Sequence, residues 1–321
     1  PPLSWTAPAG AASYRILRDG TQIATTASTS YTDAPRPADG SHTYVVRAVN
    51  AAGTVSGSAS VVVLVDATAP GTPAPTAAAS PTGAAPVISW PAASDAGSGV
   101  TGYVVERDGA VVGQPAGTSF TDAALAADGT ATYRVRAVDA AGNASAWSAQ
   151  LDVVYDATAP STPSGLGATS PTQTAPVLAW SGATDATSGV ARYRVLRDGV
   201  VLGTTTATTL EDVSAAADGT YVYAVVAVDE AGNASAASSA VSVVVDATAP
   251  AAPSGLAATS PTAAAPSLSW DAVTDAGSGL AGYRVLRDGA LVATVGTTSW
   301  TDASASEGSH VYAIRALDQA G

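Results

Sequence analysis

The apolar residues of this chain fall in short runs separated by turn residues. Between residues 156 and 245 these runs predict strands near 175–180, 193–197, 200–202, 208–210, 221–227 and 241–245. Asp198-Gly199 lies between two of them and favours a type I′ hairpin turn, because both central residues of that turn need positive φ. No segment has the period of an amphipathic helix. The pattern therefore predicts an all-β fold, with about seven short strands packed as a β-sandwich.

The same pattern recurs at a constant interval. The segment Asp-Ala-Thr-Ala-Pro stands at residues 66–70, 156–160 and 246–250, a spacing of 90 residues. A unit of ~90 residues can bury a core of its own, so each repeat is expected to be a domain. We expect complete domains at 66–155 and 156–245, and partial ones at 1–65, without a first strand, and 246–321, without a last strand. The chain is thus expected to be a window of a longer protein.

Aromatic residues recur at fixed places in every repeat. A tryptophan closes the second predicted strand, a tyrosine lies in the third, and another tyrosine opens the sixth. The residues are Trp5, Trp90, Trp180 and Trp270, then Tyr14, Tyr103, Tyr193 and Tyr283, then Tyr44, Tyr133, Tyr223 and Tyr312. This arrangement resembles the tandem fibronectin type III-like domains of bacterial secreted and cell-surface proteins. The resemblance implies an array of seven-stranded fibronectin type III or Ig-like β-sandwiches.

The charge and composition exclude several classes of function. The chain carries a net charge of −13, and all 13 of its basic residues are arginine, so nucleic acid is a poor partner. It contains no cysteine, so it forms no disulfides and its compartment cannot be inferred from redox chemistry. No apolar run reaches the ~18 residues that a membrane-spanning helix needs.

Catalysis within these repeats is not expected. The only histidines, His42 and His310, occupy equivalent positions, where the intact repeats have Ala131 and Tyr221. A catalytic histidine needs partners in a defined constellation, and neither has them. This position is the tyrosine corner of the fibronectin type III pattern, so we expect both histidines to bond or cover the corner turn. Ala131 cannot form that bond, which predicts a looser turn in its repeat.

Two short motifs are assigned to turn chemistry. Arg-Asp-Gly recurs in the hairpins, with the order reversed from the cell-adhesive tripeptide; its glycine and aspartate suit the turn, and its arginine is expected to be a charge at the strand edge. Asn-Ala-Ser, which matches a glycosylation sequon, falls in the last inter-strand turn. The copies are Arg18-Asp19-Gly20, Arg107-Asp108-Gly109, Arg197-Asp198-Gly199, Arg287-Asp288-Gly289, Asn143-Ala144-Ser145 and Asn233-Ala234-Ser235.

Three aspartates per repeat form a candidate calcium site. One lies in the linker, one in the loop after the tryptophan strand and one at the end of the sixth strand. In a fibronectin-type sandwich these places share one pole, and Ca²⁺ takes six to eight oxygen ligands. The alternative is that each aspartate caps a turn or blunts a strand edge. The sets are Asp66, Asp95 and Asp139; Asp156, Asp185 and Asp229; Asp246, Asp275 and Asp318.

Trp147 is the one aromatic residue outside the plan of the repeat, since the next repeat has Ala237 there. It either stacks on a sugar ring as a ligand-binding residue or, as we expect, packs against the adjacent linker. The linkers hold two prolines each, for example Pro160 and Pro163, which favour extended backbone. Semi-rigid joints are therefore predicted.

Together these features predict a non-catalytic array that forms a semi-rigid extracellular stalk, spacer or fibre of a secreted or cell-surface bacterial protein. One alternative is the spacer region of a secreted carbohydrate-active enzyme, and another is an adhesive module that binds a glycan or a host. The expected partners are neighbouring repeats, further copies by lateral association, or a polysaccharide. No cofactor other than calcium is indicated.

Overall fold

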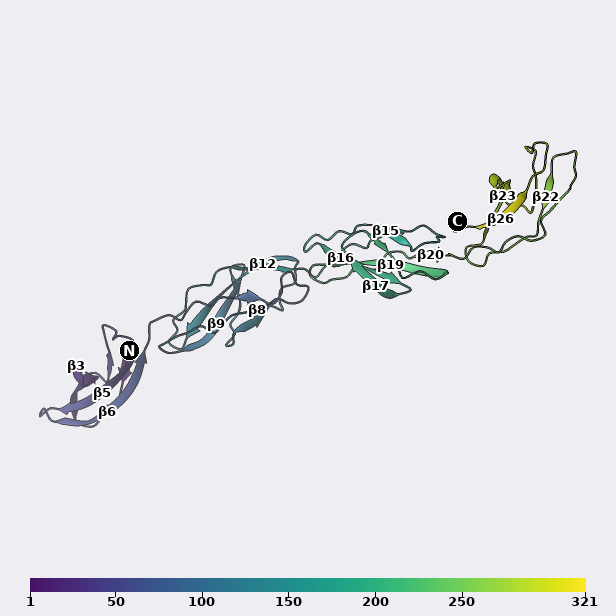
Figure 1. Ribbon diagram of the computed structural model, residues 1–321. Helices are drawn as coiled ribbons and strands as arrows, with labels where there is room; N and C mark the ends of the chain where they lie inside the picture. Colours follow the sequence, from purple (N-terminus) through teal and green to yellow (C-terminus); the bar gives the residue numbers. More distant parts are fainter. The chain divides into compact units, whose positions relative to one another are not determined.

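The computed structural model describes all residues from 1 to 321 and contains β-strands but no helix (Figure 1). No helix is therefore available to cross a membrane. The chain divides into two compact units, Pro1–Ala157 and Thr158–Gly321, and each unit contains two repeats. The predicted all-β fold is confirmed. The predicted domain boundaries within each unit stay a prediction.

The first unit builds four antiparallel sheets, two in each repeat. In the first repeat β1 pairs with β4, and the second sheet has the order β3-β2-β5-β6. In the second repeat the orders are β11-β8-β7 and β10-β9-β12-β13. The strands are β1 (Pro2–Ser4), β2 (Ala11–Arg18), β3 (Thr21–Thr26), β4 (Ser30–Thr32), β5 (Gly40–Asn50), β6 (Val55–Val65), β7 (Thr76–Ala77), β8 (Val87–Ser89), β9 (Val100–Arg107), β10 (Ala110–Gly113), β11 (Ser119–Thr121), β12 (Gly129–Asp139) and β13 (Leu151–Tyr155).

The second unit follows the same plan. Its sheets have the orders β14-β15-β18 and β17-β16-β19-β20 in the third repeat, and β21-β22-β25 and β24-β23-β26 in the fourth. The strands are β14 (Ser164–Gly167), β15 (Val177–Ser181), β16 (Val190–Arg197), β17 (Val200–Thr205), β18 (Thr209–Glu211), β19 (Gly219–Asp229), β20 (Val241–Val245), β21 (Ala257–Ala258), β22 (Ser267–Ser269), β23 (Leu280–Arg287), β24 (Ala290–Val295), β25 (Ser299–Thr301) and β26 (Tyr312–Asp318).

Each repeat packs its two sheets around a small apolar core. In the second repeat Ile88 of one sheet contacts a cluster that includes Val105 and Tyr133 of the other. The rings of Trp90 and Tyr103 meet edge to face with centroids 5.3 Å apart, and every repeat has the same pair. Aromatic bulk thus fills the space that the small alanine and valine side chains leave, as the recurrent tryptophan and tyrosine predict.

The hairpin turns have the geometry that the sequence predicts. Asp198 and Gly199 have φ values of 52° and 80°, and Arg197 pairs directly with Val200 across this two-residue loop. The Asp198 carboxylate also accepts a hydrogen bond from the backbone nitrogen of Val222 at 2.9 Å. Asp-Gly is needed here because both turn residues are left-handed. The same positive φ occurs at the other three copies, Asp19, Asp108 and Asp288.

The arginine before each turn is not a strand-edge charge, which corrects the prediction. Arg197 Nη1 lies 2.8 Å from Oδ2 of Asp212, and the hydroxyl of Tyr223 donates to the same oxygen at 2.8 Å. Asp212 is only 2% exposed, so a buried carboxylate is matched by a charge and a phenol. The same trio recurs in each repeat as Arg18, Asp33 and Tyr44; Arg107, Asp122 and Tyr133; Arg287, Asp302 and Tyr312.

A short Ser-Pro-Thr segment covers the outer edge of the last strand in the two intact repeats. In the third repeat Ser170 Oγ accepts a hydrogen bond from the nitrogen of Val244 at 2.9 Å, and Thr172 donates its own N–H to the Val244 carbonyl at 3.0 Å. Ser80 and Thr82 form the same contacts with Val154. These bonds occupy backbone groups that an open edge would offer to another chain. This cover was not predicted from the sequence.

Candidate functional site: the acidic junctions between repeats

The linker between the first and second repeats is bound by the repeat that precedes it. β6 ends at Val65, and the linker begins at Asp66 without a spacer. Asp39, in the turn before β5, accepts hydrogen bonds from the nitrogen of Ala67 at 3.1 Å and from the hydroxyl of Thr68 at 2.6 Å. The linker backbone is therefore fixed to the first repeat immediately after the last strand.

The repeat that follows binds the same linker. Asp66 Oδ2 accepts a hydrogen bond from the nitrogen of Ser98 at 2.7 Å, and the side-chain amide of Asn143 donates to the Asp66 carbonyl at 3.3 Å. The carboxylate approaches Gly97 so closely that a Cβ there would lie 2.4 Å from Cγ of Asp66. Glycine is required for this approach. The linker is thus hydrogen-bonded on both sides of the junction.

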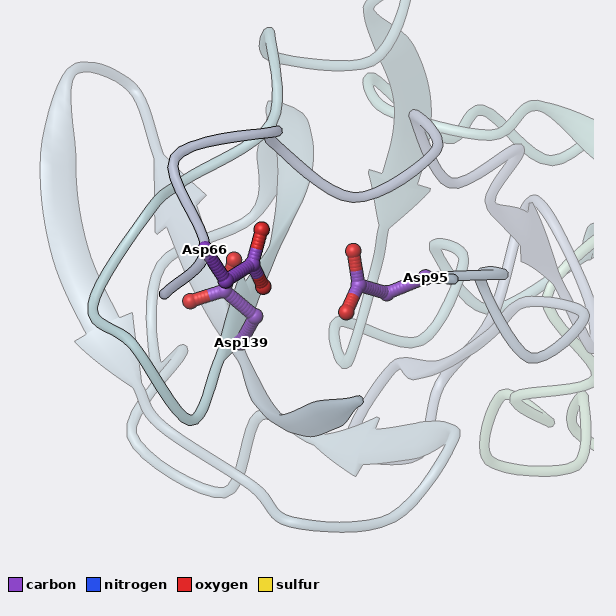
Figure 2. A group of neighbouring side chains, drawn as sticks. All are labelled: Asp66, Asp95 and Asp139. Carbon is purple, nitrogen blue, oxygen red and sulfur yellow. The ribbon is translucent and has the colours of Figure 1, made fainter. Parts of the chain in front are cut away.

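Three carboxylates meet at this junction, as the sequence predicts. Figure 2 shows Asp95 pointing toward Asp66 and Asp139, and their ligand oxygens lie within 4.8 Å of one another. Asp139 is 2% exposed and accepts bonds from the backbone and side-chain nitrogens of Asn143, both at 2.7 Å. Asp95 Oδ2 accepts one from Gly99 N at 2.6 Å, whereas its Oδ1 is buried without a partner. None of the three forms an ion pair with an arginine.

Hydrogen bonding keeps the linker carboxylate ionised. The side chain and the backbone of Ser98 both donate to Asp66 and lower its pKa, outweighing the opposing effect of burial. In the second unit Ser278 has the same effect on the pKa of Asp246. Each cluster of three carboxylates therefore concentrates negative charge, with polar N–H groups but no arginine paired to its members; at the first junction Arg36 pairs with Asp39 instead.

The second unit has an equivalent junction between the third and fourth repeats. Asp218 accepts hydrogen bonds from the nitrogen of Ala247 at 2.7 Å and from the hydroxyl of Thr248. Asp246 Oδ2 accepts one from Ser278 N at 2.6 Å. The oxygens of Asp246 also gather within 4.8 Å of those of two further carboxylates, which the sequence predicts as Asp275 and Asp318.

The members of the remaining predicted set lie in both units, Asp156 in the first and Asp185 and Asp229 in the second. Asp156, the last residue but one of the first unit, is fully buried, and its nitrogen donates to the Thr82 carbonyl at 3.0 Å. Asp185 Oδ1 caps its loop by accepting from three backbone nitrogens, those of residues 187, 188 and 189, at 3.1, 3.0 and 2.8 Å. Asp229 binds the backbone and amide nitrogens of Asn233, both at 2.8 Å. The turn-capping role predicted as the alternative is therefore present at Asp185 and Asp229.

The histidines bond the corner turn, which confirms the structural prediction. His42 Nε2 lies 2.9 Å from the carbonyl oxygen of Ala38, and His310 Nε2 lies 3.0 Å from that of Ser306. Tyr221 makes the equivalent bond to Ala217 at 3.1 Å. Ala131 has no polar side chain for this bond, and the looser turn in its repeat stays a prediction.

The two sequon asparagines are held by the turn. The side-chain amide of Asn143 donates to Asp139, and that of Asn233 donates to Asp229, as the turn interpretation predicts.

Trp147 lies against two arginines of β12, and its expected packing against the adjacent linker stays a prediction. Its ring lies beneath the guanidinium groups of Arg136 and Arg134, at 4.6 and 5.5 Å from the ring centroid. Arg134 in turn pairs with Glu106, which is largely buried. The residue thus belongs to a cation–π cluster on β12, and its role as a sugar platform stays a prediction.

Comparison with known proteins finds similarity to parts of proteins that are named as exoglucanases and as a chitinase. No family model matches the chain. Exoglucanase B and exoglucanase A of Cellulomonas fimi are each 42% identical to it over 271 and 273 residues, which is 80% of this chain but 25% and 31% of those proteins. Chitinase A1 of Niallia circulans is 37% identical over 185 residues, covering 56% of this chain and 26% of the chitinase. The chain thus spans about a quarter to a third of the curated relatives that it matches.

Solved structures similar to the chain are fibronectin type III modules. The fibronectin(III)-like modules of Clostridium thermocellum CbhA share 19% identity, with a TM-score of 0.36, over 54% of this chain and 94% of theirs. The FN1–FN3 domains of chicken CNTN1 share 17% identity, with a TM-score of 0.36, over 78% of this chain and 95% of theirs. The predicted resemblance to tandem fibronectin type III-like domains is confirmed.

Proposed function

We propose that this tandem array of fibronectin type III-like sandwiches is the non-catalytic, semi-rigid spacer region of a secreted carbohydrate-active enzyme. The observation that carries the proposal is the double attachment of the linker, by Asp39 on one side and Ser98 on the other. In a flexible tether, the N–H and carboxylate groups of these residues would be hydrogen-bonded to water instead of to each other. A linker that both repeats bind transmits orientation from one repeat to the next.

The repetition of the sandwich supports a structural role. The polar side chains that first suggested chemistry are engaged in turns, corners and ion pairs that recur from repeat to repeat. His42 and His310 bond backbone carbonyls, and Asn143 and Asn233 bond neighbouring carboxylates. A reactive centre needs a unique constellation, whereas a spacer needs only length.

The relatives favour the enzyme context over a surface stalk. Exoglucanases and a chitinase act on polymers too large to enter a cell, which supports an extracellular location. The stalk or fibre of a cell-surface protein, with lateral association of copies, is the second setting in which the same array would serve. An adhesive role through Trp147 is the third.

The purified chain separates these alternatives directly. We expect it to hydrolyse neither cellulose nor chitin and to remain in solution after mixing with either polymer. Hydrolysis would overturn the non-catalytic proposal. Retention on a polymer that is lost in Trp147→Ala, but kept in the control Val111→Ala on an exposed strand, would support adhesion instead.

As a second candidate we infer that Asp66, Asp95 and Asp139 hold Ca²⁺, and that Asp246, Asp275 and Asp318 do so in the second unit. The specific observation is the buried Oδ1 of Asp95, which lacks a partner beside two further carboxylates. Oxygen ligands of this kind suit Ca²⁺, which would neutralise the gathered charge and draw linker and loops together. Calorimetric titration with Ca²⁺ should give heat that Asp139→Asn weakens and Asp152→Asn, outside the cluster, does not. Absence of heat, together with an unchanged melting temperature, would exclude this role.

A further inference from the structure

Both ring nitrogens of His42 face hydrogen-bond acceptors. Nδ1 lies 2.7 Å from Oδ2 of Asp19, and Nε2 lies 2.9 Å from the carbonyl oxygen of Ala38. A neutral imidazole has one N–H and one lone pair, whereas the imidazolium has two N–H groups. Neither an ionised carboxylate nor a carbonyl can donate. Both contacts are therefore hydrogen bonds only when His42 is protonated.

His310 repeats this arrangement in the other unit. Its Nδ1 lies 2.7 Å from Oδ2 of Asp288, and its Nε2 lies 3.0 Å from the carbonyl of Ser306. The Ser306 hydroxyl is 3.4 Å from the same nitrogen and is the one additional group near it. At both sites, therefore, a protonated imidazole would lie between an aspartate and a backbone carbonyl.

We propose that His42 and His310 are proton-dependent latches that tie the hairpin turn to the corner turn of their repeats. The aspartate in each latch belongs to the hairpin: Asp19 Oδ1 also accepts the N–H of Thr43 at 2.8 Å. The backbone carbonyl belongs to the corner. On losing its proton the imidazole keeps an N–H toward only one of the two, and the hairpin aspartate in either case loses its cationic partner, so the hold on the hairpin weakens.

The charged groups around each ring favour the protonated form. Hydrogen bonding to Asp19, and then to the Ala38 carbonyl, raises the pKa of His42, against smaller opposing effects of burial and of Arg18. Asp288 and the Ser306 carbonyl raise the pKa of His310 in the same way, with Arg287 opposing. A raised folded-state pKa means that the latch is fully closed below the ordinary value of about 6.5 and opens as the pH rises through the folded pKa.

The chain contains its own controls for this device. The second and third repeats have Ala131 and Tyr221 in place of histidine. Their hairpin aspartates still accept the matching backbone bonds, from Thr132 to Asp108 and from Val222 to Asp198, each at 2.9 Å. Beside the histidines the matching donors are Thr43 to Asp19 and Val311 to Asp288, at 2.8 and 2.9 Å, so four equivalent amides exist, two with a histidine and two without one.

The first test follows the two imidazoles of the full chain by NMR as the pH is raised. Both Cε1–H resonances should titrate with midpoints above 6.5, which is the value of a free histidine side chain. In Asp19→Asn the His42 midpoint should move to lower pH while that of His310 stays in place, and Asp288→Asn should do the reverse. Midpoints at or below the free value would overturn the proposal.

The second test measures hydrogen exchange at the four matched amides. After correction for intrinsic rates, protection of Thr43 and Val311 should fall between pH 6 and pH 9, whereas that of Thr132 and Val222 should stay constant. If the histidines do not hold the hairpin turn, the exchange protection of all four amides should stay constant over this pH range. That result, even with shifted midpoints, would show that proton loss releases no tie and would overturn the latch.

Discussion

The carboxylate of Asp66, the first linker residue after the first repeat, accepts the backbone N–H of Ser98 in the body of the second repeat at 2.7 Å. Asp66 is the first residue after β6, and Ser98 lies in the loop that precedes β9. The bond forms because Gly97 leaves room for the carboxylate against the loop. A charged acceptor on a short linker therefore connects the end of one sandwich to the body of the next.

Removing this acceptor should loosen the junction. In Asp66→Ala the amide of Ser98 loses its partner, and its hydrogen exchange should accelerate on the order of tenfold, since bonds to charged groups exceed neutral ones in strength. Hydrogen-exchange mass spectrometry of the full chain measures this. Asp246→Ala is the matched control: it should free Ser278 and leave Ser98 unchanged. Equal exchange of Ser98 in both variants would contradict the assignment.

The buried trio of each repeat should dominate its stability. Asp122 is 1% exposed and accepts from Arg107 at 2.5 Å and from Tyr133 at 2.8 Å. Asp122→Ala removes the closer partner of Arg107, which keeps only a 4.0 Å ion pair with Asp108, and should cost the second repeat about 3–5 kcal/mol. Tyr133→Phe removes one hydrogen bond and should cost about 1–2 kcal/mol. Native-state hydrogen exchange, with the third repeat as internal reference, reports both; a larger effect for Tyr133→Phe would contradict this order.

The fourth repeat should resist acid until its buried aspartate is protonated. Burial alone would raise the pKa of Asp302, but hydrogen bonds from Ser304, Tyr312 and Arg287 outweigh it and lower the pKa to about 2. A depressed folded-state pKa contributes stability that is present above the unfolded value of 3.8 and is lost as the pH falls from there through 2. In the Asp302→Asn variant, the free energy of unfolding of this repeat should not show this fall when it is measured as the pH is lowered. A parallel loss in the variant would show that other groups cause it.

The Ser-Pro-Thr cover should protect the edge of β20. Ser170→Ala removes the acceptor of the Val244 N–H, at a cost of about 1 kcal/mol, and leaves that amide open to solvent. Exchange at Val244 should therefore rise, and the variant should aggregate more readily on heating. Ser80→Ala, the equivalent change on β13, should free Val154 and leave Val244 protected. If Val244 remains protected in Ser170→Ala, the hydroxyl is not its partner.

Much of the fold was readable from the chain because the features that set it are local. The Asp198-Gly199 turn could be recognised from two residues, and the strand at Val241–Val245 from five adjacent ones. The aspartates of the junction could be grouped because the fold resemblance placed their loops at one pole. Those steps needed no knowledge of side-chain partners.

Other contacts could not be read because their partners are far apart in sequence. Asp212 follows directly after the short strand β18, and nothing near it shows that Arg197 and Tyr223 converge on its carboxylate. The one sign of this contact in the sequence was that an aspartate recurs at this position in every repeat. Asp39 likewise looks like a turn residue, whereas its bond to Thr68 spans 29 positions. Trp147 stacks against Arg136 of β12, which lies 11 positions earlier in the sequence.

The spacer account depends on stiffness at the junction, which pulsed dipolar EPR measures directly. Because the chain has no cysteine, spin labels at Ser60→Cys and Thr130→Cys report the separation of the first and second repeats alone. The account predicts one narrow distance distribution that broadens in Asp66→Ala and broadens further when Asp39→Ala is added. A broad distribution in the parent chain, unchanged by either substitution, would contradict it.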